Sequence, residues 1–144
     1  MPSWIYDGRI IAEMSDMPEG TFGFIYEVTH TPTGRKYIGK KVLYFNRTLP
    51  PLTGQKRKRK IVKESDWKTY FGSHAEIVGL IKEGKQEEFT KQILCFVRSK
   101  KLLTYYETKY LFIKEVLEYR NNYINDNVLG KFYRKDFITP DTDD

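Results

Sequence analysis

The sequence predicts an α+β fold in which a small three-stranded antiparallel sheet is flanked by helices. Apolar and aromatic residues favour strands over residues 22–30, 35–43 and 89–97. Two capping-box patterns, one beginning at Ser73 and one at Thr104, predict the starts of two helices. A chain of 144 residues with 40% hydrophobic content can bury one real core. We therefore expect a single domain over residues 1–144.

The first two strands are expected to form a hairpin. Residues 22–30 are rich in β-branched and aromatic side chains, and Thr31-Pro32-Thr33-Gly34 supplies the turn before the return strand. The preceding residues 1–20 hold only a short aromatic anchor around Trp4 and a turn.

Residues 44–66 are the least periodic part of the chain, and we expect an exposed loop or arm there. Pro50 and Pro51 stop regular structure. A basic run follows them, made of Lys56, Arg57, Lys58, Arg59, Lys60 and Lys63. The chain carries a net charge of +6 with a pI near 9.3, although residues 141–144 form an acidic tail. This balance favours a polyanionic partner.

The second half alternates helix and strand. The capping box Ser73-His74-Ala75-Glu76 opens a helix that Gly84 can end, and residues 89–97 form the third strand. Thr104-Tyr105-Tyr106-Glu107 opens the last helix. After residue 120 we expect a loop and a terminal strand or extension.

Composition excludes several classes of protein. Cys95 is the only cysteine, so the chain has no intramolecular disulfide and no cysteine-based zinc site. Its apolar neighbours indicate a buried structural thiol. We find no signal-peptide pattern and no stretch long enough to span a bilayer. The sequence thus predicts a soluble, intracellular (cytoplasmic) protein with no membrane partner.

The first candidate catalytic residues lie in the predicted hairpin. Tyr26 and Tyr37 lie on partner strands, where their hydroxyls are able to share a site, and Gly39 removes a side chain beside them. Lys40 and Lys41 add cations at the same end. Such a group of side chains can hold a phosphate and a water molecule. The alternative is a plain hairpin stabilised by aromatic cross-strand pairs.

Longer motifs favour the first interpretation. FIY at residues 24–26, YIG at 37–39, SDWKTYFGS at 65–73, Glu107 at a helix start and YIN at 123–125 together resemble the GIY-YIG nucleases. The resemblance is to the phage-encoded, homing-endonuclease-like Seg-type branch and covers roughly residues 20–137. Phe24 stands where the family usually has Gly.

The resemblance implies metal-dependent hydrolysis of phosphodiester bonds, with one Mg²⁺ or Mn²⁺ per site held by Glu107. It implies that Tyr26 and Tyr37 position and activate the nucleophile, with Tyr26 as the proton acceptor. Lys40 matches a lysine of the excision-repair relatives, and Asn125 matches an asparagine that supports the site. The alternatives are that Glu107 only caps Thr104 and that Lys40 is an ordinary strand lysine.

Other assignments remain open between residues. Arg47 matches the family arginine that binds the scissile phosphate, but the nearby prolines leave little room for the usual helix, and Arg57 or Arg59 is the alternative. Tyr70 and His74 are possible assisting groups. For His74 the alternative is an exposed residue in the first turn of the capped helix.

We therefore expect an endonuclease that cuts double-stranded DNA to 5′-phosphate and 3′-hydroxyl ends. The residues expected to contact DNA are Lys41, Lys56, Arg57, Lys58, Arg59, Lys60 and Lys63. Site choice is expected to depend on this arm, on a homodimer or on a protein partner, in a host cell infected by a phage. A catalytically inactive DNA-binding or adaptor protein, and an RNA-binding module, are the alternatives.

Overall fold

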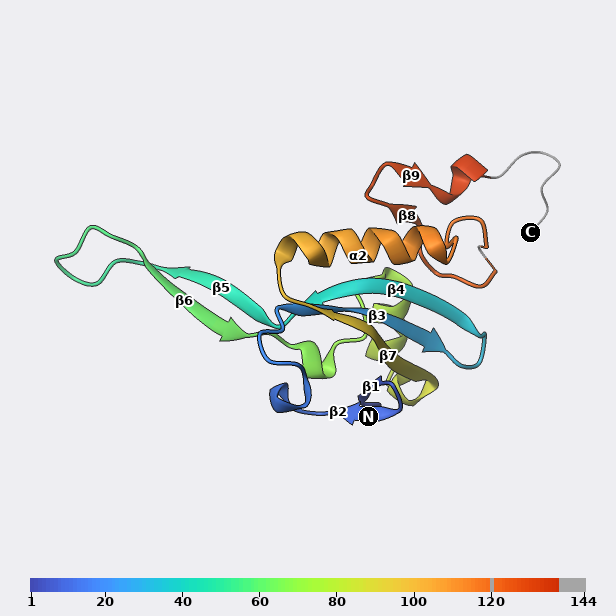
Figure 1. Ribbon diagram of the computed structural model, residues 1–144, viewed down its shortest axis with the longest axis horizontal. Helices are drawn as coiled ribbons and strands as arrows, with labels where there is room; N and C mark the ends of the chain where they lie inside the picture. The colour runs from blue at the N-terminus through green and yellow to red at the C-terminus, as the bar shows by residue number, and fades with distance from the viewer. Residues whose placement is uncertain (120, 138–144) are drawn as a thin grey trace.

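The computed structural model describes residues 1–119 and 121–137, with the backbone alone for Arg47, and is built on a five-stranded sheet (Figure 1). Its order is β2-β1-β7-β3-β4. The strands are β1 (Trp4–Tyr6), β2 (Arg9–Ile11), β3 (Gly23–His30), β4 (Arg35–Val42) and β7 (Phe89–Val97). Only β1 and β7 pair in parallel; the other pairs are antiparallel.

The predicted sheet of three strands is therefore too small. Its members are confirmed as β3, β4 and β7, but β1 and β2 extend the sheet beyond β7. Each of these two strands has only three residues, too few for an alternating pattern to be visible in the sequence. The Trp4 segment predicted as an aromatic anchor is thus an integral strand.

The exposed loop or arm expected over residues 44–66 is an arm, most of which is a two-stranded ribbon. It consists of β5 (Tyr44–Leu49) and β6 (Arg59–Glu64), which pair only with each other and extend away from the body (Figure 1). Pro50 and Pro51 follow the end of β5, so they limit the strand without interrupting it. Every residue of β6 is exposed, and without a buried face a strand shows no apolar alternation.

Both predicted helices exist but begin elsewhere. Helix α1 (Ala75–Lys82) has His74 as its N-cap, whose ring accepts from the Glu76 N–H, so Ser73 is not the cap. Helix α2 (Lys100–Ile113) is capped by Ser99, which accepts from the Leu102 N–H. Thr104 therefore lies inside α2, which excludes the helix start predicted at Thr104 and the alternative that Glu107 only caps it.

Short elements complete the described chain. A third sheet pairs β8 (Asn127–Val128) with β9 (Phe132–Tyr133). The 3-10 helices are η1 (Met14–Asp16), η2 (Trp67–Thr69), η3 (Gln86–Glu88) and η4 (Arg134–Phe137). The predicted acidic tail at residues 141–144 lies outside the described residues. Within the described part of the chain, no helix is long and apolar enough to cross a membrane.

The core lies on both faces of the sheet, which is why β3 is buried along most of its length. Phe24, Tyr26 and Val28 pack on one face with the Trp67 ring, which is fully buried. Ile25 packs on the other face, where α2 covers the sheet (Figure 1). The register between β3 and β7 shifts beside Tyr26, so a bulge sits next to one of the candidate residues. Cys95 is only partly buried, and burial raises the pKa of its thiol.

Candidate active site at the edge of the sheet

The edge strand β4 brings together the two tyrosines singled out in the sequence. Tyr26 pairs directly with Gly39, and Tyr37 lies two residues before Gly39 on β4. The ring centroids of Tyr26 and Tyr37 are 6.3 Å apart. A Cβ on Gly39 would lie 2.6 Å from Tyr26 Cζ, so only glycine lets the Tyr26 ring cross the edge strand. Gly72, at φ +116°, closes over both rings from the next segment.

Tyr26 is an interior residue of the site. It is 1% exposed, and burial raises the pKa of its hydroxyl well above the usual value. A hydrogen bond to Tyr70 and the nearby Glu107 carboxylate act in the same direction. Tyr26 therefore remains protonated at neutral pH, and its hydroxyl serves best as a fixed hydrogen-bond donor.

Of the two hairpin tyrosines, Tyr37 is the one that reaches solvent. It lines a cleft of about 320 Å³ together with Lys40, His74, Glu107 and Asn125. Burial raises the pKa of its hydroxyl, and a hydrogen bond from Ser73 partly offsets that effect. Tyr37 thus presents a neutral hydroxyl to whatever enters the cleft.

Glu107 reaches the cleft from the opposite face of the sheet. It lies on α2 four residues after Leu103 and four before Leu111, and both leucines are buried, so the three share the face turned toward the sheet. Its side chain keeps 20% exposure, and burial raises the pKa of the carboxyl while Lys40 lowers it. Lys40 Nζ lies 3.8 Å from Glu107 Oε1 and donates to Thr104 Oγ1 at 3.3 Å.

Asn125 holds the cleft wall in place. Its side-chain amide forms the same two hydrogen bonds to Ile38 that a neighbouring strand would form. Oδ1 accepts from the Ile38 N–H at 3.0 Å, and Nδ2 donates to the Ile38 carbonyl at 2.9 Å. Arg134 fixes the same loop by donating to the carbonyls of Val116, Tyr123 and Asn125. The two hydrogen bonds of the buried Asn125 amide fix the position of β4 at the wall of the cleft.

His74 is fixed by two hydrogen bonds. Its Nδ1 accepts from the Glu76 N–H at 3.1 Å, so the ring proton sits on Nε2, which donates to Asp126 Oδ2 at 2.7 Å. A ring arranged in this way has no free nitrogen to accept a proton. His74 therefore caps α1 and orients Asp126, which lines the same cleft.

The predicted DNA-contacting cations fall into two groups. Lys41 is buried, pairs with Asp66 at 2.6 Å and lies 3.9 Å from the centre of the Tyr70 ring, so in this structure it fastens the segment after the ribbon. The others are exposed on the ribbon: Lys56, Arg57 and Lys58 in its loop, and Arg59, Lys60 and Lys63 on β6. Arg47 lies on β5 opposite Ile61, so the position is in a strand and not a helix.

The residues present suit a hard, hydrated cation. Among the described residues no group of three or more His, Cys, Asp or Glu side chains forms a cage for a metal ion. Mg²⁺ needs no cage, because it keeps several waters and takes one or two carboxylates. Glu107 supplies one carboxylate, Asp126 lines the same open cleft, and the donors are oxygens. The oxygen donors of Glu107 and Asp126 therefore suit Mg²⁺ or Mn²⁺.

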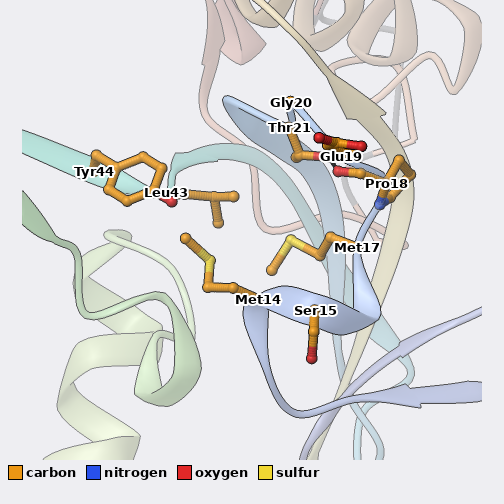
Figure 2. Close-up of a pocket in the computed structure, with 9 residues that line it drawn as sticks. All are labelled: Met14, Ser15, Met17, Pro18, Glu19, Gly20, Thr21, Leu43 and Tyr44. Carbon is orange, nitrogen blue, oxygen red and sulfur yellow. Dashed lines mark hydrogen bonds between the residues drawn. The ribbon is translucent and has the colours of Figure 1, made fainter.

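A second hollow, of about 370 Å³, lies at the root of the ribbon and has a different character (Figure 2). Met14 and Met17 point toward Leu43 there, and Tyr44, the first residue of β5, completes that side. None of the residues predicted for catalysis lines it. We assign the chemistry to the cleft beside β4.

The chain is similar to a known protein family. A family model described as "Putative endonuclease segE, GIY-YIG domain" matches residues 4–128. The chain therefore belongs to the GIY-YIG nuclease family, in its Seg-type branch. Searches of the curated proteins and of the solved structures found no match.

Sequence reasoning missed three residues that shape the site. Asp126 follows Asn125 and enters the cleft, but a single exposed aspartate gives no sequence signal. Arg134 and Gly72 act through backbone carbonyls and close packing, which a pattern of residue types does not reveal.

Proposed function

We propose that this protein is a metal-dependent DNA endonuclease that hydrolyses phosphodiester bonds to 5′-phosphate and 3′-hydroxyl ends. The observation that carries the proposal is the cleft beside β4, where Tyr37, Lys40 and Glu107 from two faces of the sheet meet in a chain of the GIY-YIG family. Mg²⁺ or Mn²⁺ bound by Glu107 would supply Lewis-acid stabilisation of the charge on the phosphate and the leaving oxygen.

The two tyrosines take unequal parts in this proposal. Tyr37 lines the cleft and donates a hydrogen bond to the phosphate or to the attacking water. Tyr26 stays buried and protonated, so its hydroxyl orders Tyr70 through their hydrogen bond. The sequence-based hypothesis that Tyr26 accepts the proton is therefore replaced by a positioning role.

Lys40 is placed to neutralise negative charge in the cleft. Its ammonium lies 3.8 Å from the Glu107 carboxylate, beside the cleft, and is 42% exposed. In that position it neutralises an entering phosphate and balances a carboxylate that is costly to bury. Asn125 keeps Ile38, and with it the neighbouring Tyr37, at a fixed place relative to α2.

None of Tyr26, Tyr37 and His74 offers a free acceptor for the proton of the attacking water. Tyr26, Tyr37 and His74 each hold their protons in the arrangement described above. We propose that the proton leaves through solvent in the open cleft. The ribbon cations hold phosphates of the double-stranded DNA.

A cleavage assay tests the proposal. Wild-type protein is incubated with supercoiled plasmid and Mg²⁺, beside Glu107→Gln and the matched control Glu83→Gln, an exposed glutamate at the end of α1. We expect Glu107→Gln to lose at least roughly 100-fold in rate, because metal-ion stabilisation is worth several kcal/mol. The control should cut like wild type, and DNA ligase should reseal the products. A Glu107→Gln variant that cuts at the wild-type rate would refute the assignment.

A further inference from the structure

The β5–β6 ribbon has two chemically different faces. Directly paired residues of an antiparallel ribbon share a face. One face carries Asn46 opposite Val62 and Thr48 opposite Lys60. The other carries Phe45 opposite Lys63 and Leu49 opposite Arg59. Apart from the half-buried Leu49, the described side chains of both strands are exposed, so both faces are open to a partner.

The ribbon is held firmly at its root. Ser65 N donates to the Leu43 carbonyl at 2.7 Å, Ser65 Oγ donates to the Val42 carbonyl at 2.7 Å, and Leu43 is 1% exposed. Leu43 is also the one residue that separates β4 from β5. The strand that carries Tyr37 and Lys40 therefore continues almost directly into the ribbon.

The positive charge of the ribbon favours a polyanionic partner. Six cations lie between residues 56 and 63, and Glu64, at the root, is the sole acidic residue from 44 to 64. The aromatic residues of the ribbon, Tyr44 and Phe45, are at the root as well. The outer part has no aromatic ring on which an unpaired base could stack. This distribution favours a duplex over a single strand.

The shape of the ribbon selects one groove. Two strands of six residues extend about 20 Å, and the major groove of B-DNA, about 12 Å wide, admits a two-stranded ribbon. Side chains of the Asn46 face are suited to base edges: Asn reads adenine, Lys reads guanine, Thr hydrogen-bonds to either, and an apolar side chain such as Val contacts the thymine methyl group.

We propose that the β5–β6 ribbon enters the major groove of duplex DNA and that Asn46 and Thr48 contact base edges there. The inference rests on the proposed DNA-cleaving function and adds a sequence-reading surface to it. Lys56, Arg57 and Lys58 in the loop contact phosphates and carry no sequence information. Because the ribbon continues β4, the bases it contacts lie at a fixed distance from the bond that is cut.

Selection from a randomised duplex pool tests the ribbon without requiring cleavage. Full-length protein in EDTA captures duplexes, which are amplified and sequenced over several rounds. The variants are Asn46→Ala/Thr48→Ala, the loop variant Lys56→Gln/Arg57→Gln/Lys58→Gln, and the control Gln92→Ala, an exposed amide on β7. Circular dichroism and thermal unfolding confirm that each variant keeps the fold.

We expect the wild type and Gln92→Ala to enrich the same sequence, bound at least on the order of tenfold more tightly than a scrambled duplex. Asn46→Ala/Thr48→Ala should bind both duplexes equally. The loop variant should keep the preference and lower the slope of log affinity against log salt by roughly 3.

Three results would overturn the inference: no enriched sequence with wild type, the same enrichment with Asn46→Ala/Thr48→Ala, or displacement by single-stranded DNA as effective as by duplex. If the protein nevertheless cuts plasmid, the nuclease proposal stands alone. If the ribbon selects a sequence and the plasmid stays intact, the ribbon inference stands and the nuclease proposal fails.

Discussion

Replacement of Lys91 by Met is expected to change how the stability of the fold depends on pH. Lys91 is the third of the nine residues of β7 and is 1% exposed. Its ammonium donates to the carbonyls of Lys68 at 3.2 Å and Tyr70 at 2.7 Å. It also lies 4.4 Å from the ring centres of Trp4 and Phe71. Burial without a carboxylate partner lowers its pKa from 10.5 to about 8.

The sign and size of the effect follow from that pKa. Between pH 8 and 10.5 the unfolded chain binds a proton at Lys91 that the folded protein has lost, so the free energy of unfolding rises with pH. The free energy of unfolding rises by about 2 kcal/mol between pH 7 and pH 9.5. Almost all of this rise occurs above the folded pKa, because below it Lys91 is protonated in both states. Met fills similar space and does not titrate, so Lys91→Met should lack this gain.

Urea unfolding followed by circular dichroism at pH 7, 8, 9 and 9.5 measures the difference. Cys95 and the buried tyrosines are present in every variant, so their contributions cancel when Lys91→Met is subtracted from wild type. Lys101→Met, an exposed lysine in the first turn of α2, is the control and should follow wild type. A wild-type curve parallel to that of Lys91→Met would show that the ammonium stays charged in the folded protein, and would refute the reasoning.

Three shorter predictions concern the cleft. Gly39→Ala places a Cβ 2.6 Å from Cζ of Tyr26 and should lower the unfolding free energy, measured with urea, by about 1–3 kcal/mol. Gly79→Ala is the control: its Cβ meets nothing within 4 Å, so it should not lower the stability of the protein. Asn125→Leu leaves a buried N–H and carbonyl unpaired and should lower the unfolding free energy by about 3 kcal/mol. Lys40→Met removes the cation that lowers the pKa of Glu107, so the acidic limb of the pH profile of plasmid cleavage should move to higher pH; an unchanged limb would contradict that coupling.

The proximity of the two tyrosines was predictable because antiparallel pairing turns sequence spacing into spatial register. Tyr26, Gly39 and Tyr37 follow from such a register once the turn at Pro32 is recognised. Glu107 was selected by resemblance, and its orientation follows from the buried leucines four residues to either side. The outer strands β1 and β2 escaped prediction because three residues give no period, and Lys41 was assigned to DNA because its pairing with Asp66 depends on tertiary packing.

Residues 44–66 were expected to form an exposed loop or arm, and the arm consists of two paired strands that the sequence did not reveal. Alternation of apolar and polar residues records burial of one face, and β6 buries neither face, so its sequence resembles that of a solvated arm. A loop with these cations can neutralise phosphates but holds no side chain in a fixed place. A ribbon does, because hydrogen bonding to β5 sets which residues lie side by side, as Asn46 and Val62 do. If the ribbon enters the major groove as proposed, the same basic segment discriminates between DNA sequences and does not only attract DNA.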